Sequence, residues 1–339
     1  NGVDARLLLD SYDNLGLEGT GWHHVAAALD RSSTVKFYLD GKFVGERDAS
    51  AFDGDSLSNN SANFMVGYAN TAAKIQGSID QLRIYSYVRT QTQVAWDYNQ
   101  GAPVAQWKMD ECQGGAIHDS SGNNNHGTLS FGGSGQTSFG TCATSTPSGP
   151  WYNGRLGKFN TSLKLDGSDD YVNVPHNAML NPNGADFSIS AWVKNGSSLD
   201  ADTNIYPIIS KGVYGVGSNQ EVYLMLRGGS YNGVYLRFRN AASGQDLKAT
   251  TDIHSDLSNN QWHHIAVSIK MGTTSQLYVD GKLVGSLVMS QVINPTESLY
   301  IGRYGTYYFP GQIDDVRIYN YALTSQQVKT IMNGGAVRF

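Results

Sequence analysis

The stretch Gly21-Trp22-His23-His24-Val25-Ala26 returns later in the chain as Gln261-Trp262-His263-His264-Ile265-Ala266, and the residues that follow return in register. Phe37-Tyr38-Leu39-Asp40-Gly41-Lys42 corresponds to Leu277-Tyr278-Val279-Asp280-Gly281-Lys282. A period of about 240 residues has the length of a whole domain, which indicates a tandem array and not a solenoid of short repeats. The fold must therefore be interpreted in units of this repeat.

Alternating apolar and polar residues indicate what each unit is made of. In Val35–Leu39 and in Val234–Arg239 an apolar residue occupies every second place, which predicts half-buried antiparallel strands. Asp40-Gly41 and Asp280-Gly281 each lie between two such runs, and Asp-Gly supplies the positive φ values that a type I′ hairpin needs. We therefore predict an all-β fold in which two antiparallel sheets form a sandwich.

A short helix is expected at the C-terminal end of each unit. Thr90–Gln93 and Thr324–Gln327 have the pattern of a capping box, and Gly101 and Gly334 follow where each helix should end. The linker Ala102-Pro103-Val104 is too short to be flexible, so we expect successive units to keep a nearly fixed orientation.

The two units are expected to differ in completeness. Residues 1–101 correspond to the C-terminal part of a unit whose N-terminal half is missing, whereas residues 102–339 correspond to a complete unit. Half a sandwich would leave one sheet face exposed to water. Either the chain was cut from a longer array, or another chain completes the fold.

Composition limits the classes of function. The chain has 339 residues and a net charge of −5, and its basic residues form no run that would follow a phosphate backbone, so a nucleic-acid partner is not expected. No apolar run approaches the roughly 20 residues that cross a bilayer. The content of 39 Gly and 20 Tyr is typical of a turn-rich extracellular β protein. Cys112 and Cys142 are expected to form a disulfide in an oxidising compartment; two free thiols are the alternative.

Five segments in this order carry a resemblance to a known family: Trp107–Glu111, Asp119–Gly127, Leu163–Val172, Trp262–His264 and Gly311–Asn320. They resemble the signature segments of the laminin-G-like jelly-roll domains of the concanavalin-A-like lectin/glucanase superfamily. The resemblance implies a two-sheet jelly roll. It implies less about function, because the same sandwich serves in carbohydrate binding, adhesion, enzyme accessory roles and spacing.

The resemblance also implies a structural calcium ion, which such domains often hold between their first and last strands. The matching residues here are Asp110, Asp119, Asn124 and Asp314, whose oxygen atoms are ligands that Ca²⁺ prefers. Strict alternation would put Asp314 on the face of Val316 and Ile318, where a carboxylate needs a partner, and would put Asp80 on the face of Leu82 and Ile84. Alternatively, the loop at residues 119–125 is an ordinary turn held by side-chain-to-backbone hydrogen bonds, and Asp314 caps a strand end.

A binding surface is expected among the tyrosines of the second unit. Planar rings stack on the apolar faces of sugars, and Tyr304, Tyr307, Tyr308 and Tyr231 are the candidates. Equally, these tyrosines could be half-buried covers or contacts between subunits.

Neither a metal site at the His-His pairs nor a glucanase active site is expected. Adjacent histidines on a strand point to opposite faces, so each His-His pair should be structural. The Glu-x-Asp-x-x-Glu strand of the superfamily's glucanases, which pairs two carboxylates, has no match in this chain, so we do not expect an enzyme.

The sequence thus favours a non-catalytic extracellular or cell-surface module that acts in adhesion by binding a glycan or a cell-surface protein. The alternative is a structural subunit of a filament or stalk, which self-associates so that a neighbouring chain completes the truncated first unit. A third interpretation, an accessory domain of a glycoside hydrolase or sialidase, depends on residues outside this chain.

Overall fold

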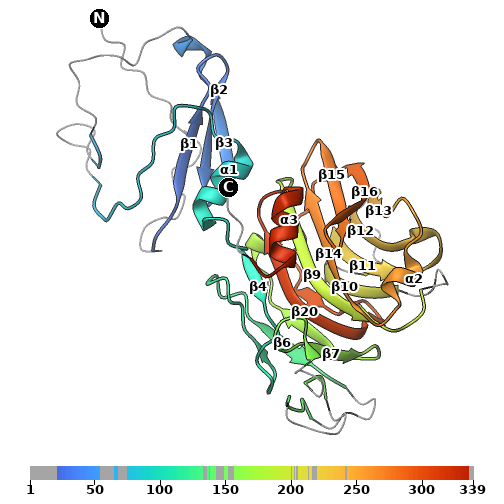
Figure 1. Cartoon of the computed structure of the whole chain (residues 1–339). Helices are drawn as coiled ribbons and strands as arrows, with labels where there is room; N and C mark the ends of the chain where they lie inside the picture. Colours follow the sequence, from blue (N-terminus) through green and yellow to red (C-terminus); the bar gives the residue numbers. More distant parts are fainter. Residues whose placement is uncertain are drawn as a thin grey trace, which may run out of the picture. The chain divides into compact units, whose positions relative to one another are not determined.

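The computed structural model describes residues 21–53, 65–67, 75–132, 136, 138–142, 149–151, 156–199, 201, 203, 205–212, 214–215, 220–240 and 243–335. The chain divides into two compact units, Asn1–Val94 (unit 1) and Ala95–Phe339 (unit 2) (Figure 1). The division falls within the helix α1 (Gln91–Asn99).

Unit 2 is built almost entirely of β-strands. These are β4 (Ala105–Trp107), β5 (Ala116–Ile117), β6 (Gly127–Ser130), β7 (Leu163–Asp166), β8 (Tyr171–Val174), β9 (Phe187–Asn195), β10 (Ile205–Lys211), β11 (Glu221–Arg227), β12 (Gly233–Arg239), β13 (Gly244–Lys248), β14 (Trp262–Ile269), β15 (Thr274–Val279), β16 (Lys282–Val288), β17 (Leu299–Ile301), β18 (Arg303–Tyr304), β19 (Tyr307–Tyr308) and β20 (Pro310–Tyr319). The short helices are η3 (Ala178–Leu180), η4 (Gly229–Tyr231), α2 (His254–Leu257) and α3 (Ser325–Met332).

These strands form the predicted two-sheet sandwich. One sheet has eight strands in the order β13-β12-β11-β10-β17-β8-β6-β5, and the other has seven, β16-β15-β14-β9-β20-β4 with β7 paired to β20. Every second residue points inward, so that Leu224 and Leu236 of one sheet and Ile265 and Val267 of the other share one core. The prediction of an all-β jelly-roll sandwich is confirmed.

The predicted turns and caps are confirmed. Asp280 and Gly281 have φ of +49° and +71°, and their counterparts Asp40 and Gly41 have +49° and +74°, as a type I′ hairpin requires. In α3 the Thr324 hydroxyl accepts from the Gln327 backbone N–H and the Gln327 side chain accepts from the Thr324 N–H. The same two bonds join Thr90 and Gln93 at the start of α1.

The last strand of unit 2 contains a β-bulge that the alternation argument missed. Asp315 has a φ of +46°, and the pairing of β20 with β9 shifts register between Asp314 and Arg317. Because a bulge inserts one extra residue, Val316 points into the core, whereas Asp314 lies opposite Trp192 on the outer face. The prediction that Asp314 shares a face with Val316 and Ile318 is therefore wrong.

Unit 1 contains β1 (Val25–Leu29), β2 (Thr34–Leu39), β3 (Lys42–Asp48) and η1 (Ser50–Phe52). The first three form one antiparallel sheet, β1-β2-β3. Residues 77–85, the counterpart of β20, form no strand, and Leu82 and Ile84 are exposed. In unit 2 the corresponding strand is held between β9 and β4, and the described part of unit 1 contains no counterpart of either. The predicted strand face for Asp80 is therefore wrong as well.

Candidate functional site

The outer face of the eight-stranded sheet carries a concentration of tyrosines. In β11, Val222, Leu224 and Leu226 enter the core, so Tyr223 points to the opposite face. Tyr235 in β12 lies on the same face, and its ring is 5.8 Å from that of Tyr223. We call this surface, from β8 across β17 and β10 to β12, the tyrosine face.

The hairpin formed by β18 and β19 packs against β10 at the edge of this face. The Ser210 hydroxyl donates to the Arg303 carbonyl at 2.6 Å, which fixes the start of the hairpin. The Tyr304 ring lies 4.3 Å from that of Tyr223, and the Tyr304 hydroxyl donates to Glu221 Oε2 at 2.8 Å. Tyr304 is buried, so it supports the hairpin and offers no ring to a ligand.

Half-exposed tyrosines surround Arg303 at one end of the tyrosine face. The guanidinium carbon of Arg303 lies 4.6 Å from the ring centre of Tyr171, 5.2 Å from Tyr300 and 5.8 Å from Tyr308. Arg303 Nε donates to the Gly305 carbonyl at 3.1 Å, and within the described part of the chain no acid pairs with this arginine. The Arg303 guanidinium is therefore held among three tyrosine rings, and it keeps N–H groups that can donate hydrogen bonds to a ligand.

A second aromatic group lies further along the face. The guanidinium carbon of Arg227 is 3.8 Å from the ring centre of Tyr231, which is half-buried. Tyr307 is also half-buried, and its ring is 5.9 Å from that of Tyr214. Of the four predicted tyrosines, the structure thus offers Tyr307, Tyr308 and Tyr231 at the surface.

Sequence reasoning missed Tyr171, Tyr300 and Arg303 as members of this site. Tyr171 and Tyr300 belong to strands β8 and β17, which lie far apart in sequence and pair only in the sheet. The alternation in Tyr171-Val172-Asn173-Val174 was the available signal, since Val172 and Val174 are buried and Tyr171 must point outward.

Of the four predicted calcium ligands, Asp119 and Asn124 lie in one loop, and Asp110 and Asp314 both contact residues 159–161. Asp119 is buried, and its carboxylate accepts from the backbone N–H groups of Gln106, Ser121 and Asn125, each at 2.9 Å, and from the Ser121 hydroxyl. Through these four hydrogen bonds, the Asp119 carboxylate fixes the conformation of the loop that follows it. Asn124 lies in that loop with a φ of +57° and is exposed.

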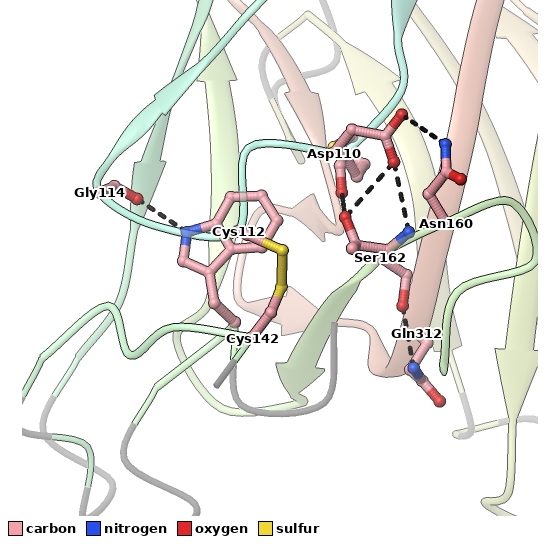
Figure 2. The surroundings of a disulfide bond; sticks show 10 residues. Asp110, Cys112, Gly114, Cys142, Asn160, Ser162 and Gln312 are labelled. Carbon is pink, nitrogen blue, oxygen red and sulfur yellow. Dashed lines mark hydrogen bonds between the residues drawn. A yellow bond between two sulfur atoms is a disulfide. The ribbon is translucent and has the colours of Figure 1, made fainter. Parts of the chain in front are cut away.

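Asp110 and Asp314 lie near the segment 158–161, whose Phe159 ring packs edge-on against Trp192 of β9. Asp110 accepts from the Asn160 amide and the Thr161 backbone N–H, each at 3.3 Å (Figure 2). Asp314 Oδ2 accepts from the Phe159 N–H at 2.9 Å, but its buried Oδ1 has no hydrogen-bond partner. Burial raises the pKa of Asp314 to about 8, and the charges of Asp315 and Asp110 add to the effect. A calcium ion at these residues stays a prediction.

The disulfide between Cys112 and Cys142 is confirmed, with a Cα–Cα distance of 5.0 Å (Figure 2). The Cys142 N–H donates to the Cys112 carbonyl at 3.2 Å. Close by, the buried Trp151 indole donates to the Gly114 carbonyl at 2.8 Å. Together these contacts attach the segment after the first strand to the sandwich.

The His-His pairs have the same structural role in both units. His263 Nδ1 lies 2.8 Å from Asp280 Oδ2, and the His264 N–H donates to Asp280 Oδ1 at 2.8 Å. His23 and His24 make the same two contacts with Asp40, each at 2.9 Å. The Trp-His-His and Asp-Gly motifs thus recur together because the aspartate of the hairpin binds the strand that carries the histidines.

Comparison with known proteins identifies a family for most of the chain. Residues 11–95 and 166–329 match the model of the concanavalin A-like lectin/glucanases superfamily. No curated protein matches the chain.

A solved structure with a TM-score above 0.5 has a similar fold. The binding domain of Paraclostridial Mosquitocidal Protein 1 is 18% identical, with a TM-score of 0.51, over 69% of this chain and 52% of that one. The binding domain of Botulinum neurotoxin DC, solved in complex with rat synaptotagmin II, is 18% identical, with a TM-score of 0.49, over 70% and 52%. The matches therefore span about half the length of those structures. Within the described residues, no helix is both long enough and apolar enough to cross a bilayer.

Proposed function

The chain belongs to the concanavalin A-like lectin/glucanase superfamily, and from this premise we propose that unit 2 is a non-catalytic module that binds a carbohydrate on its tyrosine face. The observation that carries the proposal is the group of half-exposed rings, Tyr171, Tyr300 and Tyr308, around Arg303. Rings of this kind stack on the apolar face of a sugar, while the guanidinium donates hydrogen bonds to its oxygens.

Two acids on the outer face of this sheet, Glu221 and Asp246, already bind other side chains, which supports a non-catalytic role. Glu221 Oε1 accepts from Arg239 at 3.1 Å and its Oε2 from Tyr304 at 2.8 Å. Asp246 pairs with Arg237 through both of its oxygens. Glycoside hydrolysis needs two carboxylates of which one can give up a proton and the other can attack or activate water, and neither Glu221 nor Asp246 is free for that work.

The disulfide supports a location outside the cell or at its surface, because disulfides persist in oxidising compartments. There the module would act in adhesion, attaching its parent protein to a glycan or a glycosylated surface.

A glycan array probed with the whole chain, followed by calorimetry on the best ligand, tests the proposal. We expect Tyr308→Ala and Tyr300→Ala each to weaken binding about fivefold, since one stacked ring contributes roughly 1 kcal/mol. Tyr87→Ala, which removes an exposed tyrosine from unit 1, should bind like wild type. A folded wild-type chain without any glycan ligand at millimolar concentration would contradict the proposal.

A second candidate function, a structural subunit, is favoured by the exposed apolar face of β1 and by exposed apolar side chains in residues 77–85. Val25 is 70% exposed and Ile84 is 72% exposed, whereas their counterparts Ile265 and Ile318 are fully buried beneath the opposite sheet of unit 2. A neighbouring chain that supplied a second sheet would cover this face. Light scattering and electron microscopy should then show ordered polymers, which Val25→Lys reduces and Leu283→Lys, an exposed position of unit 2, does not. A monodisperse monomer would remove this candidate.

A further inference from the structure

The turn between β7 and β8 carries three acids in five residues. Strand β7 pairs with β20 in the seven-stranded sheet, and β8 pairs with β6 and β17 in the eight-stranded sheet, so the turn connects the two layers. One carboxylate oxygen from each of Asp166, Asp169 and Asp170 lies within 4.8 Å of the others. Three negative charges at this separation repel one another unless a cation lies between them.

Asp170 provides an independent sign of an incomplete environment. Its side chain is fully buried. One oxygen, Oδ2, accepts from Gln136 Nε2 at 2.8 Å and from the Asp166 N–H at 3.0 Å. The other, Oδ1, is buried without any hydrogen-bond partner. A buried carboxylate oxygen without a donor or a cation is costly, so the fold is expected to supply a ligand for it.

The chain around the turn leaves oxygen atoms available. Asp166 Oδ1 accepts from the Ser168 N–H at 2.8 Å and the Asp169 N–H at 3.3 Å, so the turn is held by one oxygen of Asp166. Within the described residues, no lysine, arginine or histidine forms an ion pair with Asp166 or Asp170. Gly132 lies so close to the cluster that a Cβ there would be 2.1 Å from Asp169 Oδ2. A residue with a side chain would therefore collide with Asp169 at this position.

We propose that Asp166, Asp169 and Asp170 bind one Ca²⁺ ion, which joins the two sheets where the chain crosses between them. The ligand set consists of carboxylate oxygens, which suit a hard cation and exclude a preference for zinc. Asp166 is exposed, so water can complete the coordination. Tyr171 follows Asp170 directly, and the ion would therefore also stabilise the strand end that presents this tyrosine beside Arg303.

Titration of the chelator-treated whole chain with CaCl₂ at pH 7.5, by calorimetry and thermal unfolding, tests the site. We expect one bound Ca²⁺ with a dissociation constant of about 10⁻⁴–10⁻³ M or tighter, and an unfolding temperature that rises with calcium concentration. Asp170→Asn and Asp169→Asn should abolish both effects. The matched variant Asp256→Asn, an exposed acid of α2, should bind like wild type.

The behaviour of Asp170→Asn without calcium distinguishes a lost ligand from a damaged fold. The amide removes one of three repelling charges and can donate to the remaining carboxylates, so this variant should unfold in chelator at or above the wild-type temperature. A lower temperature would assign Asp170 a purely structural role and overturn the proposal. The proposal would also be overturned if millimolar calcium neither bound to the wild-type chain nor raised its unfolding temperature. Calcium binding that survives Asp170→Asn but disappears in Asp314→Asn would place the ion at the first and last strands instead.

Discussion

His264 shows how the environment of a single residue couples stability to pH. It is buried, and its ring lies 5.3 Å from that of Trp192. Burial, with a smaller contribution from the Arg317 charge, lowers the pKa of His264 to about 4. In the unfolded chain the same imidazole titrates near 6.5. Between these values the unfolded state binds a proton that the folded state excludes.

The stability that His264 contributes is therefore complete above pH 6.5 and is lost as the pH falls toward 4. The difference of the two pKa values corresponds to about 3 kcal/mol in the free energy of unfolding. Urea unfolding between pH 7.5 and 4.5 should show this loss in wild type and a smaller loss in His264→Gln. His118→Gln, which replaces an exposed histidine, should follow wild type, and equal slopes in all three proteins would refute the assignment.

At the scale of elements, the hairpin between β15 and β16 is tied to β14 through Asp280. This aspartate adopts a positive φ and accepts two hydrogen bonds from β14. Asp280→Ala should lower the free energy of unfolding by about 1–3 kcal/mol, because it leaves polar groups without partners and puts alanine in a left-handed backbone. Asp280→Asn should cost less, since asparagine tolerates this backbone and keeps an acceptor. Equal losses in chemical denaturation would contradict this explanation.

The disulfide acts on a second element, the segment between β4 and β7. The bond closes a loop with a sequence separation of 30 residues. Reduction should lower the stability of unit 2 by roughly 2–4 kcal/mol through the entropy of the unfolded chain. Denaturant unfolding with and without reductant measures the effect, and the double variant Cys112→Ala/Cys142→Ala should match the reduced protein. A reduced protein as stable as the oxidised one would show that Trp151 and its neighbours already hold the segment.

For the whole molecule, the two units are expected to unfold separately. Among the described residues of unit 1, the buried apolar cluster consists of Ala28, Tyr38 and Val94, whereas unit 2 has a core that both sheets share. A three-stranded sheet with so small a buried cluster is expected to be marginally stable. Calorimetry should therefore show a small transition at lower temperature and a large one above it, and a single two-state transition would contradict independent units.

Much of the fold could be predicted because its signals are local. The Asp-Gly turns need only the positive φ of two neighbouring residues, and the capping boxes need only four consecutive residues. The bulge at Asp315 escaped prediction because it depends on how β20 pairs with β9, and no residue type in Asp314-Asp315-Val316 marks an insertion. The buried position of Tyr304 escaped for a similar reason, since its partners Tyr223 and Glu221 lie about 80 residues away in sequence.

The sequence by itself determined the antiparallel sandwich, the hairpins and the terminal helices, because periodicity and turn chemistry act between residues close along the chain. The repeat was visible in the sequence as well, and the resemblance to a known family implied the jelly roll. Only the tertiary structure decided which tyrosines reach the surface beside Arg303, and which acids of unit 2 lie together. Those properties arise where strands distant in sequence become neighbours in a sheet, and their positions follow from the register and packing of the two layers.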